Sequence, residues 1–309
     1  MSPASISRQL DPKSMANGPK ISRICFGCEP LGGADWGRIS VPDIASAISR
    51  ALELGVSFFD TADVYGLGLS ETRLSEILGA KRHDVVIATK GGMCWQEPTS
   101  GGRASISRDS SPAYLRAAVE SSLRRLRLDQ IPIYFIHWPD ADTEIKHTFE
   151  FLSTLKAEGK IGNIGCSNFS AEQVREACEV SEVSFVQLPM NLLGEDMDLQ
   201  MVELVKEKSI GVVAYNVLAN GLLTGKYKTN SRFDKDDRRN RLPLFQGEAY
   251  LQALHQVTEI AALAKVENLT CAQYSISSIL QREYVVSAVL GIKSREQIEE
   301  NSSVMFGSL

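Results

Sequence analysis

The chain has 309 residues, of which 43% are hydrophobic and 23% charged, a composition typical of globular proteins. The net charge is −5 and no long basic run occurs, which argues against a nucleic-acid-binding protein. No apolar stretch approaches the roughly 18 residues of a membrane span, and the polar N-terminus lacks the apolar region of a signal peptide. We therefore expect a cytoplasmic protein without nucleic-acid or membrane partners.

Strand-like and helix-like segments alternate along the chain. The strand-like segments are continuous apolar runs, typical of strands covered by helices, at 23–28, 56–61, 84–90, 133–138, 161–167, 184–189, 211–216 and 285–292. Amphipathic segments with helical spacing lie between them, at 41–55, 70–79, 111–128, about 143–158, 170–180, 198–208, 249–266, 270–281 and 294–301. Ser70 and Ser111 are predicted N-caps, with Pro112 at the first helical position.

Eight such β–α repeats close naturally into a (β/α)₈ TIM barrel, here predicted as a single domain over residues 1–309. Residues 7–10 and 20–23 are predicted to form an N-terminal β-hairpin that closes the bottom of the barrel. The competing doubly wound sheet usually has fewer strands, and "GLGLSE" (66–71) lacks the last glycine of its dinucleotide motif. Two long loops, 91–110 and 224–247, follow strands and should lie at the C-terminal face, where we expect the cluster "DKDDRRNR" to be solvated.

The cysteines do not form a metal-binding pattern. Cys25 and Cys28 are close together, but no second pair at matched spacing completes a zinc site. We expect no metal and interpret both as small apolar residues in or beside a strand.

Polar residues end three successive predicted strands. Asp60 ends the second strand, Lys90 the third and His137 the fourth, while Tyr65 follows the second by a short turn. A tyrosine is a poor acid or base at neutral pH unless a nearby ammonium stabilises its phenolate and lowers its pKa. An aspartate would hold that lysine, and a histidine would either hydrogen-bond to a substrate carbonyl or tune the tyrosine. Such a set suits protonation of an oxygen that gains negative charge, as in hydride addition to a carbonyl.

The same residues lie in motifs that resemble the aldo-keto reductases. The motifs "GVSFFDTADVYG", "VVIATKGG", "FIHWPD", "IGCSNF", "VVAYN…GLLTGKY" and "GIKSREQIEEN" occur in the family's order over nearly the whole chain. The resemblance implies a barrel enzyme that reduces aldehydes or ketones with NADPH. It also implies a catalytic tetrad of Asp60, Tyr65, Lys90 and His137, in which Tyr65 is the general acid.

The resemblance also implies a set of residues that contact NADP(H). Ser167, Asn168 and Gln187 match positions that bind the carboxamide, and Tyr215 matches the aromatic that stacks on the nicotinamide. The remaining predicted contacts are in the pyrophosphate loop and near the 2′-phosphate and adenine: Asn216, Leu218, Lys293, Ser294, Arg295, Gln297 and Asn301. The last five follow a strand at a helix N-terminus, which favours anions. The family's Tyr-Ser-Pro-Leu is replaced by Tyr215-Asn216-Val217-Leu218, which predicts loss of a rigid turn.

The substrate is less well defined by the sequence. Trp36, Trp95 and Trp138 either wall a substrate pocket or pack in the core. The leading expectation is reduction of a small-molecule carbonyl, possibly a sugar or sugar-derived compound, by a monomer or small homo-oligomer. Two alternatives stay open: a redox-neutral sugar epimerase or eliminase with tightly bound nicotinamide, and a cofactor-sensing regulatory subunit.

Overall fold

The computed structural model describes residues 18–96 and 104–306. Within these ranges eight parallel strands close into a barrel, with the last strand paired to the first. In order around the barrel they are β1 (Ile24–Gly27), β2 (Phe58–Asp60), β3 (Val86–Gly91), β6 (Ile131–Ile136), β7 (Ile161–Ser167), β8 (Val183–Pro189), β9 (Gly211–Tyr215) and β10 (Val285–Gly291). The predicted (β/α)₈ barrel is therefore confirmed.

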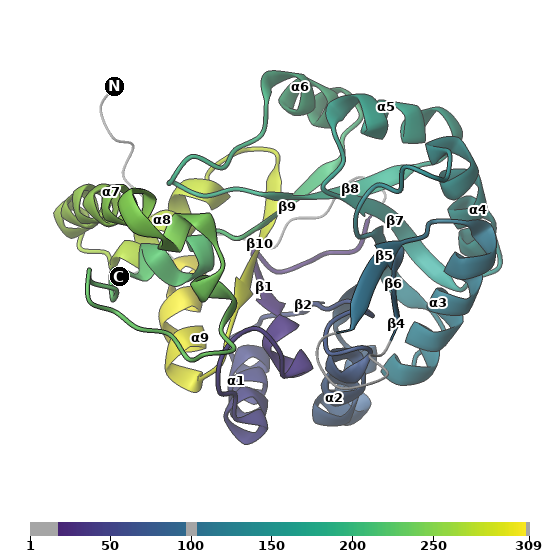
Figure 1. Cartoon of the computed structure of the whole chain (residues 1–309). Helices are drawn as coiled ribbons and strands as arrows, with labels where there is room; N and C mark the ends of the chain where they lie inside the picture. The colour runs from purple at the N-terminus through teal and green to yellow at the C-terminus, as the bar shows by residue number, and fades with distance from the viewer. Residues whose placement is uncertain (1–17, 97–103, 307–309) are drawn as a thin grey trace.

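Helices form a ring around this sheet (Figure 1). They are α1 (Val41–Glu53), α2 (Leu69–Leu78), α3 (Pro112–Leu126), α4 (Ile145–Ala157), α5 (Ala171–Val180), α6 (Leu199–Glu207), α7 (Gly247–Val266), α8 (Cys271–Leu280) and α9 (Arg295–Ser302). Short 3₁₀ turns are η1 (Glu29–Gly32), η2 (Gly79–His83), η3 (Ala219–Thr224), η4 (Arg238–Asn240), η5 (Pro243–Phe245) and η6 (Ser303–Met305). No helix in the described ranges is long and apolar enough to cross a membrane.

Helix caps follow the sequence in one predicted case and not in the other. The Ser111 side chain accepts a hydrogen bond from the Tyr114 N–H, so this predicted N-cap is confirmed. The prediction for Ser70 is wrong, because α2 begins earlier, after the left-handed Gly68. The Ser70 hydroxyl instead donates to the Cys28 carbonyl and ties α2 to the end of β1.

Two apolar layers hold the barrel, one inside the sheet and one between the sheet and the helices. Phe58 lies inside, whereas Phe59 packs outside and stacks on Phe26 with ring centroids 5.7 Å apart. Neighbouring residues of a strand point to opposite faces, so the pair of phenylalanines serves both layers. Cys25 lies in the inner layer and Cys28 in the outer one, and burial raises the pKa of both thiols.

Some loop predictions need correction. The predicted loop 91–110 contains an antiparallel pair, β4 (Met93–Gln96) and β5 (Ser105–Arg108), with residues 97–103 outside the described ranges. Residues 7–10, the first arm of the predicted N-terminal hairpin, also lie outside them, so the hairpin stays a prediction, as does the single domain over 1–309.

Candidate functional site

Asp60, Lys90 and His137 meet at the carboxyl edge of the barrel because they end three neighbouring strands. Asp60 is the last residue of β2, Lys90 is the penultimate residue of β3, and His137 directly follows β6. Parallel strands in a closed sheet all deliver their carboxyl ends to one face, where barrel enzymes carry their sites. Tyr65 reaches the same face from the loop between β2 and α2.

Lys90 is an almost fully buried ammonium, with 1% of its side chain exposed. Its Nζ donates to Asp60 Oδ1 at 2.6 Å and to the Thr61 carbonyl at 2.8 Å. The other carboxylate oxygen of Asp60 accepts from Gln187 Nε2 at 2.8 Å. A buried charge needs this kind of pairing, and here it fixes the ammonium 5.1 Å from the centre of the Tyr65 ring.

Tyr65 and His137 lie edge to face, with ring centroids 5.7 Å apart and an interplanar angle of 84°. Burial, and next the charge of Lys90, lowers the pKa of His137 well below its usual value, so the imidazole is neutral at pH 7. A neutral imidazole keeps one N–H donor. The backbone of His137 is fixed on both sides, donating to the Gly91 carbonyl and accepting from Asn168 Nδ2.

The acidity of Tyr65 differs from the sequence-based expectation. Burial raises the pKa of Tyr65 well above its usual value, and the carboxylates of Glu29 and Asp60 raise it further. The expected lowering of this pKa by Lys90 is therefore not seen in the protein alone. The phenol consequently keeps its proton over the ordinary pH range.

The residues expected at the carboxamide are connected to one another beside the tetrad. Asn168 adopts a left-handed backbone, with φ 65°, at the end of β7. Its Nδ2 donates to Ser167 Oγ at 3.1 Å, and its Oδ1 accepts from the Tyr215 hydroxyl at 2.7 Å. Gln187 points to Asp60 instead, so its amide joins this group to the buried ion pair.

A cleft of about 430 Å³ opens next to Tyr215, between the ends of β9 and β10. Of the predicted cofactor and pocket residues, those that line it are Trp36, Asn216, Leu218, Lys293, Gln297 and Asn301. The sequence analysis missed Pro30, Val217, Asn220, Gly221, Thr224, Lys226, Tyr227, Arg239, Val289, Leu290, Gly291 and Glu300, which also line it. Ser294 is not among the lining residues, because its hydroxyl caps α9 by accepting from the Gln297 N–H.

Arg295 points away from the cleft. Its guanidinium pairs with Glu299 at 3.1 Å and reaches Glu53 of α1 at 4.0 Å. Arg295 is therefore not among the residues that line the cleft.

Three cations gather on the cleft: Lys226, Arg239 and Lys293. Burial, followed by the charge of Arg239, lowers the pKa of both lysines.

Arg239 is held by the carboxylate of Asp237, which is only 2% exposed. The prediction that the cluster "DKDDRRNR" is a solvated loop is therefore wrong for these two residues. The sequence did contain one indication that this loop packs onto the protein, because the loop follows a strand and so lies at the face that carries the site.

Side-chain hydrogen bonds hold the turn after β9, where the family's serine and proline are absent. Asn216 and Asn220 are left-handed, with φ 55° and 54°, a conformation that asparagine tolerates. Asn216 Oδ1 accepts from the Asn220 N–H at 2.8 Å, and its Nδ2 donates to Glu195 Oε2 at 2.7 Å. Glu195 also accepts from Asn191 Nδ2 at 2.5 Å. These bonds can replace the contacts of the family's serine and proline, and the predicted loss of a rigid turn stays a prediction.

The tryptophans occupy different places. Trp36 lines the cleft, with the guanidinium of Arg238 5.3 Å from its ring centroid. Trp138 is contacted by Arg108 of β5, 5.1 Å from its ring centroid, and Trp95 lies in β4. Walling of the substrate pocket by Trp95 and Trp138 stays a prediction.

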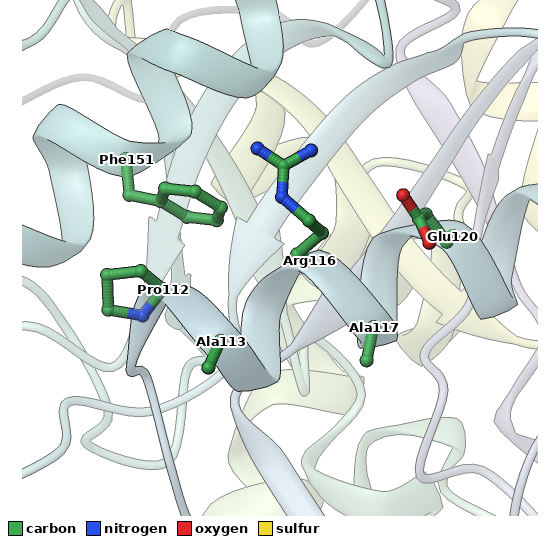
Figure 2. Close-up of a pocket in the computed structure, with 6 residues that line it drawn as sticks. All are labelled: Pro112, Ala113, Arg116, Ala117, Glu120 and Phe151. Carbon is green, nitrogen blue, oxygen red and sulfur yellow. The ribbon is translucent and has the colours of Figure 1, made fainter.

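A second depression lies on the outside of the barrel, between α3 and α4 (Figure 2). Arg116 and Phe151 face each other across it, and Arg116 is paired with both carboxylate oxygens of Glu158 at 2.8 Å. None of the predicted site residues lines this depression. The tetrad and the cleft at the barrel mouth therefore form the candidate active site.

Comparison with known proteins agrees with this fold. The sequence model of the Aldo/keto reductase family matches residues 23–308. The chain is 32% identical over 294 residues to "Aldo-keto reductase yakc [NADP(+)]" of Schizosaccharomyces pombe, covering 94% of this chain and 84% of that protein. It is 30% identical over 295 residues to the NADH-specific methylglyoxal reductase of Escherichia coli, covering 92% and 90%. Among solved structures, a glycerol dehydrogenase from Gluconobacter oxydans superposes with a TM-score of 0.88 at 33% identity, covering 97% of this chain and 91% of that one.

Proposed function

The chain belongs to the aldo/keto reductase family, and from this premise we propose that it reduces a small aldehyde or ketone to an alcohol with hydride from NADPH. The observation that carries the proposal is the buried Lys90–Asp60 ion pair beside Tyr65, with neutral His137 against the same ring. These groups meet at the end of the barrel where such enzymes do their chemistry.

The residues of the cleft fit a dinucleotide that carries phosphates. Lys226, Arg239 and Lys293 supply positive charge in one half-buried place, which suits pyrophosphate and a 2′-phosphate. We propose that Tyr215 stacks on the nicotinamide ring, that Ser167 and Asn168 hold its carboxamide, and that Gln297 and Asn301 lie at the adenosine end. When bound, NADPH supplies the hydride. Both an NADP(+) enzyme and an NADH-specific enzyme are among the relatives, and the three cations favour NADPH here.

In the proposed proton step, Tyr65 donates its phenolic proton to the carbonyl oxygen as that oxygen becomes negative. Burial favours the neutral phenol, so Tyr65 is in the donor form at pH 7. The neutral imidazole of His137 donates a second hydrogen bond to the same oxygen and orients the carbonyl. Lys90, fixed by Asp60, then stabilises the phenolate that remains.

We further propose that the substrate is small and polar, such as a sugar or a sugar-derived carbonyl. The relatives named for methylglyoxal reduction and glycerol dehydrogenation support this choice, because both compounds are three-carbon and oxygen-rich. The ion pairs and hydrogen-bonding groups at the barrel mouth also suit a polar substrate.

A direct test is to incubate the protein with NADPH or NADH and a panel of aldehydes, ketones and aldoses, and to follow the absorbance of the reduced nicotinamide. We expect turnover of at least one short aldehyde, faster with NADPH. Binding of NADPH without turnover of any carbonyl would refute the proposal. A changed sugar product without net NADPH consumption would favour the redox-neutral epimerase instead.

A further inference from the structure

Glu29 is held next to the catalytic tyrosine by backbone packing. It is the first residue of the turn η1, which follows β1 and Cys28. The backbone N–H of Cys28 donates to the Asp60 carbonyl. At the end of η1, Gly32 lies so close to the Tyr65–Gly66 backbone that an added Cβ would be 2.8 Å from the Tyr65 carbonyl carbon. This contact leaves no room for a larger residue, and it fixes η1 against the loop that carries Tyr65.

Arg238 approaches Glu29 from a different loop, the one that follows β9. Its Nη1 donates to Glu29 Oε1 at 2.8 Å, and its backbone N–H donates to the Asp35 carbonyl at 2.8 Å. The Glu29 and Arg238 side chains are 32% and 34% exposed. The pair is therefore fixed in position yet open to a ligand at the barrel mouth.

The contact of η1 with the Tyr65 loop places this pair beside the reaction centre, and the charges of Glu29 and Arg238 act on the groups there. Burial raises the pKa of Tyr65, Glu29 is the next largest cause in the same direction, and Arg238 opposes it. Burial raises the pKa of Tyr215 to about 12, with Arg238 and Glu29 again acting in opposite directions. Both charges therefore act on both phenols, the proposed proton donor and the proposed nicotinamide support.

We propose that the Glu29–Arg238 pair is a specificity determinant that selects carbonyl substrates with a hydroxyl group on the carbon next to the carbonyl. This inference rests on the proposed carbonyl reduction. A hydroxyl group donates one hydrogen bond and accepts others, and a carboxylate beside a guanidinium offers both partners. The bond to Arg238 and an interaction with the Trp36 side chain use only part of the accepting capacity of the Glu29 carboxylate, and Arg238 has five N–H donors.

Two other substrate classes are disfavoured by the same geometry. An alkyl chain in this place would remove water from both charged groups and return no hydrogen bond, which a polar site penalises strongly. The carboxylate of a 2-oxo acid would be attracted by Arg238 but would meet the negative charge of Glu29. A neutral hydroxyl satisfies both partners.

The test compares glyceraldehyde with propionaldehyde, which has the same carbon chain without hydroxyl groups. We expect the wild type to have a kcat/KM for glyceraldehyde at least about tenfold higher. In Glu29→Gln and in Arg238→Met this ratio should fall at least about tenfold, mainly through KM for glyceraldehyde. The matched control is Arg241→Gln, which removes the 2.6 Å pair with Asp35 between the same two loops and should leave the ratio within about twofold.

The outcomes separate this inference from the proposed function. If Glu29→Gln lowers kcat/KM for both aldehydes equally, the pair only tunes Tyr65 or holds the loops, and the inference is overturned. Equal activity of the wild type on both aldehydes, or an equal loss of the ratio in Arg241→Gln, also overturns it. If the wild type reduces no carbonyl at all, the proposed function fails first and this inference fails with it.

Discussion

Replacing Tyr65 with phenylalanine tests the centre of the proposed chemistry. Phenylalanine keeps the ring, and with it the 5.7 Å contact with His137 and the 5.1 Å contact with the Lys90 ammonium. The loss is confined to the hydroxyl group that supplies the proton. The variant should therefore fold normally and lack only the proposed general acid.

The expected size of the effect follows from that single lost group. A positioned general acid contributes about 10²–10⁴-fold, and one donor to a developing oxyanion contributes about 10²–10³-fold. Both contributions pass through the same O–H of Tyr65, so they overlap and do not multiply. We expect kcat to fall about 10²–10⁴-fold, which corresponds to about 2.7–5.5 kcal/mol of transition-state stabilisation.

The assay combines three measurements on Tyr65→Phe: kcat at saturating NADPH, NADPH affinity by fluorescence titration, and the thermal midpoint of unfolding. Affinity and midpoint should stay near the wild-type values. The matched control is Tyr284→Phe, because Tyr284 precedes β10 at the opposite end of the barrel, where it is contacted by Lys206. A kcat for Tyr65→Phe within tenfold of the wild type would refute the assignment of Tyr65 as the proton donor.

Three further predictions follow from the site and its surroundings. Asn216→Ala removes the hydrogen bonds to Glu195 and Asn220 and places alanine at φ 55°. The KM for NADPH should therefore rise about tenfold, a larger change than the fall in kcat, and an unchanged KM would contradict a role of this turn in cofactor binding. His137 has a lowered pKa, so the unfolded chain takes up a proton near pH 6.5 that the folded protein does not; wild-type stability should therefore fall as the pH drops below about 6.5, by up to ~1.4 kcal/mol per unit. Urea unfolding of His137→Gln between pH 7 and 5 should lack this contribution, and an identical slope would mean that the imidazole is charged. Burial, and next the charge of Glu71, raises the pKa of the Asp63 carboxyl well above its usual value. The folded protein therefore keeps a proton on Asp63 that the unfolded chain releases as the pH rises above about 3.9, so the free energy of unfolding falls above that pH. Asp63→Asn should stabilise the protein by about 1–3 kcal/mol at pH 8 and less at pH 4, and destabilisation at both pH values would contradict this reasoning.

The barrel and the meeting of the four candidate catalytic residues at one face could be predicted from local patterns. Each strand was visible as a continuous apolar run, because a parallel strand is buried on both faces. Once eight strands were expected to close into a barrel, Asp60, Lys90 and His137 had to share one face, because parallel strands carry their carboxyl ends to the same edge. The position of Tyr65 followed from the short turn after Asp60.

The loops could not be predicted in the same way. The pair β4–β5 is half exposed or fully exposed and has no strong apolar pattern, so the sequence indicated only a loop. Asp237 and Arg239 lie in a charged run that resembles a solvated segment, yet the loop folds onto the residues after β1, buries Asp237 and leaves only 12% of the Arg239 side chain exposed. Contacts between residues some 200 positions apart leave no local periodicity to detect.

The sequence by itself determined the order of strands and helices, the closed barrel and the placement of Asp60, Lys90 and His137 at one face, because these depend on periodic burial and on the common direction of the strands. Only the tertiary structure decided the surroundings of those groups. It showed that burial keeps the proton on Tyr65, that Arg295 turns away from the cleft while Lys226 and Arg239 enter it, and that Glu29 meets Arg238 across the barrel mouth. The physical reason is that pKa values and loop positions depend on desolvation and on charges brought together from distant parts of the chain.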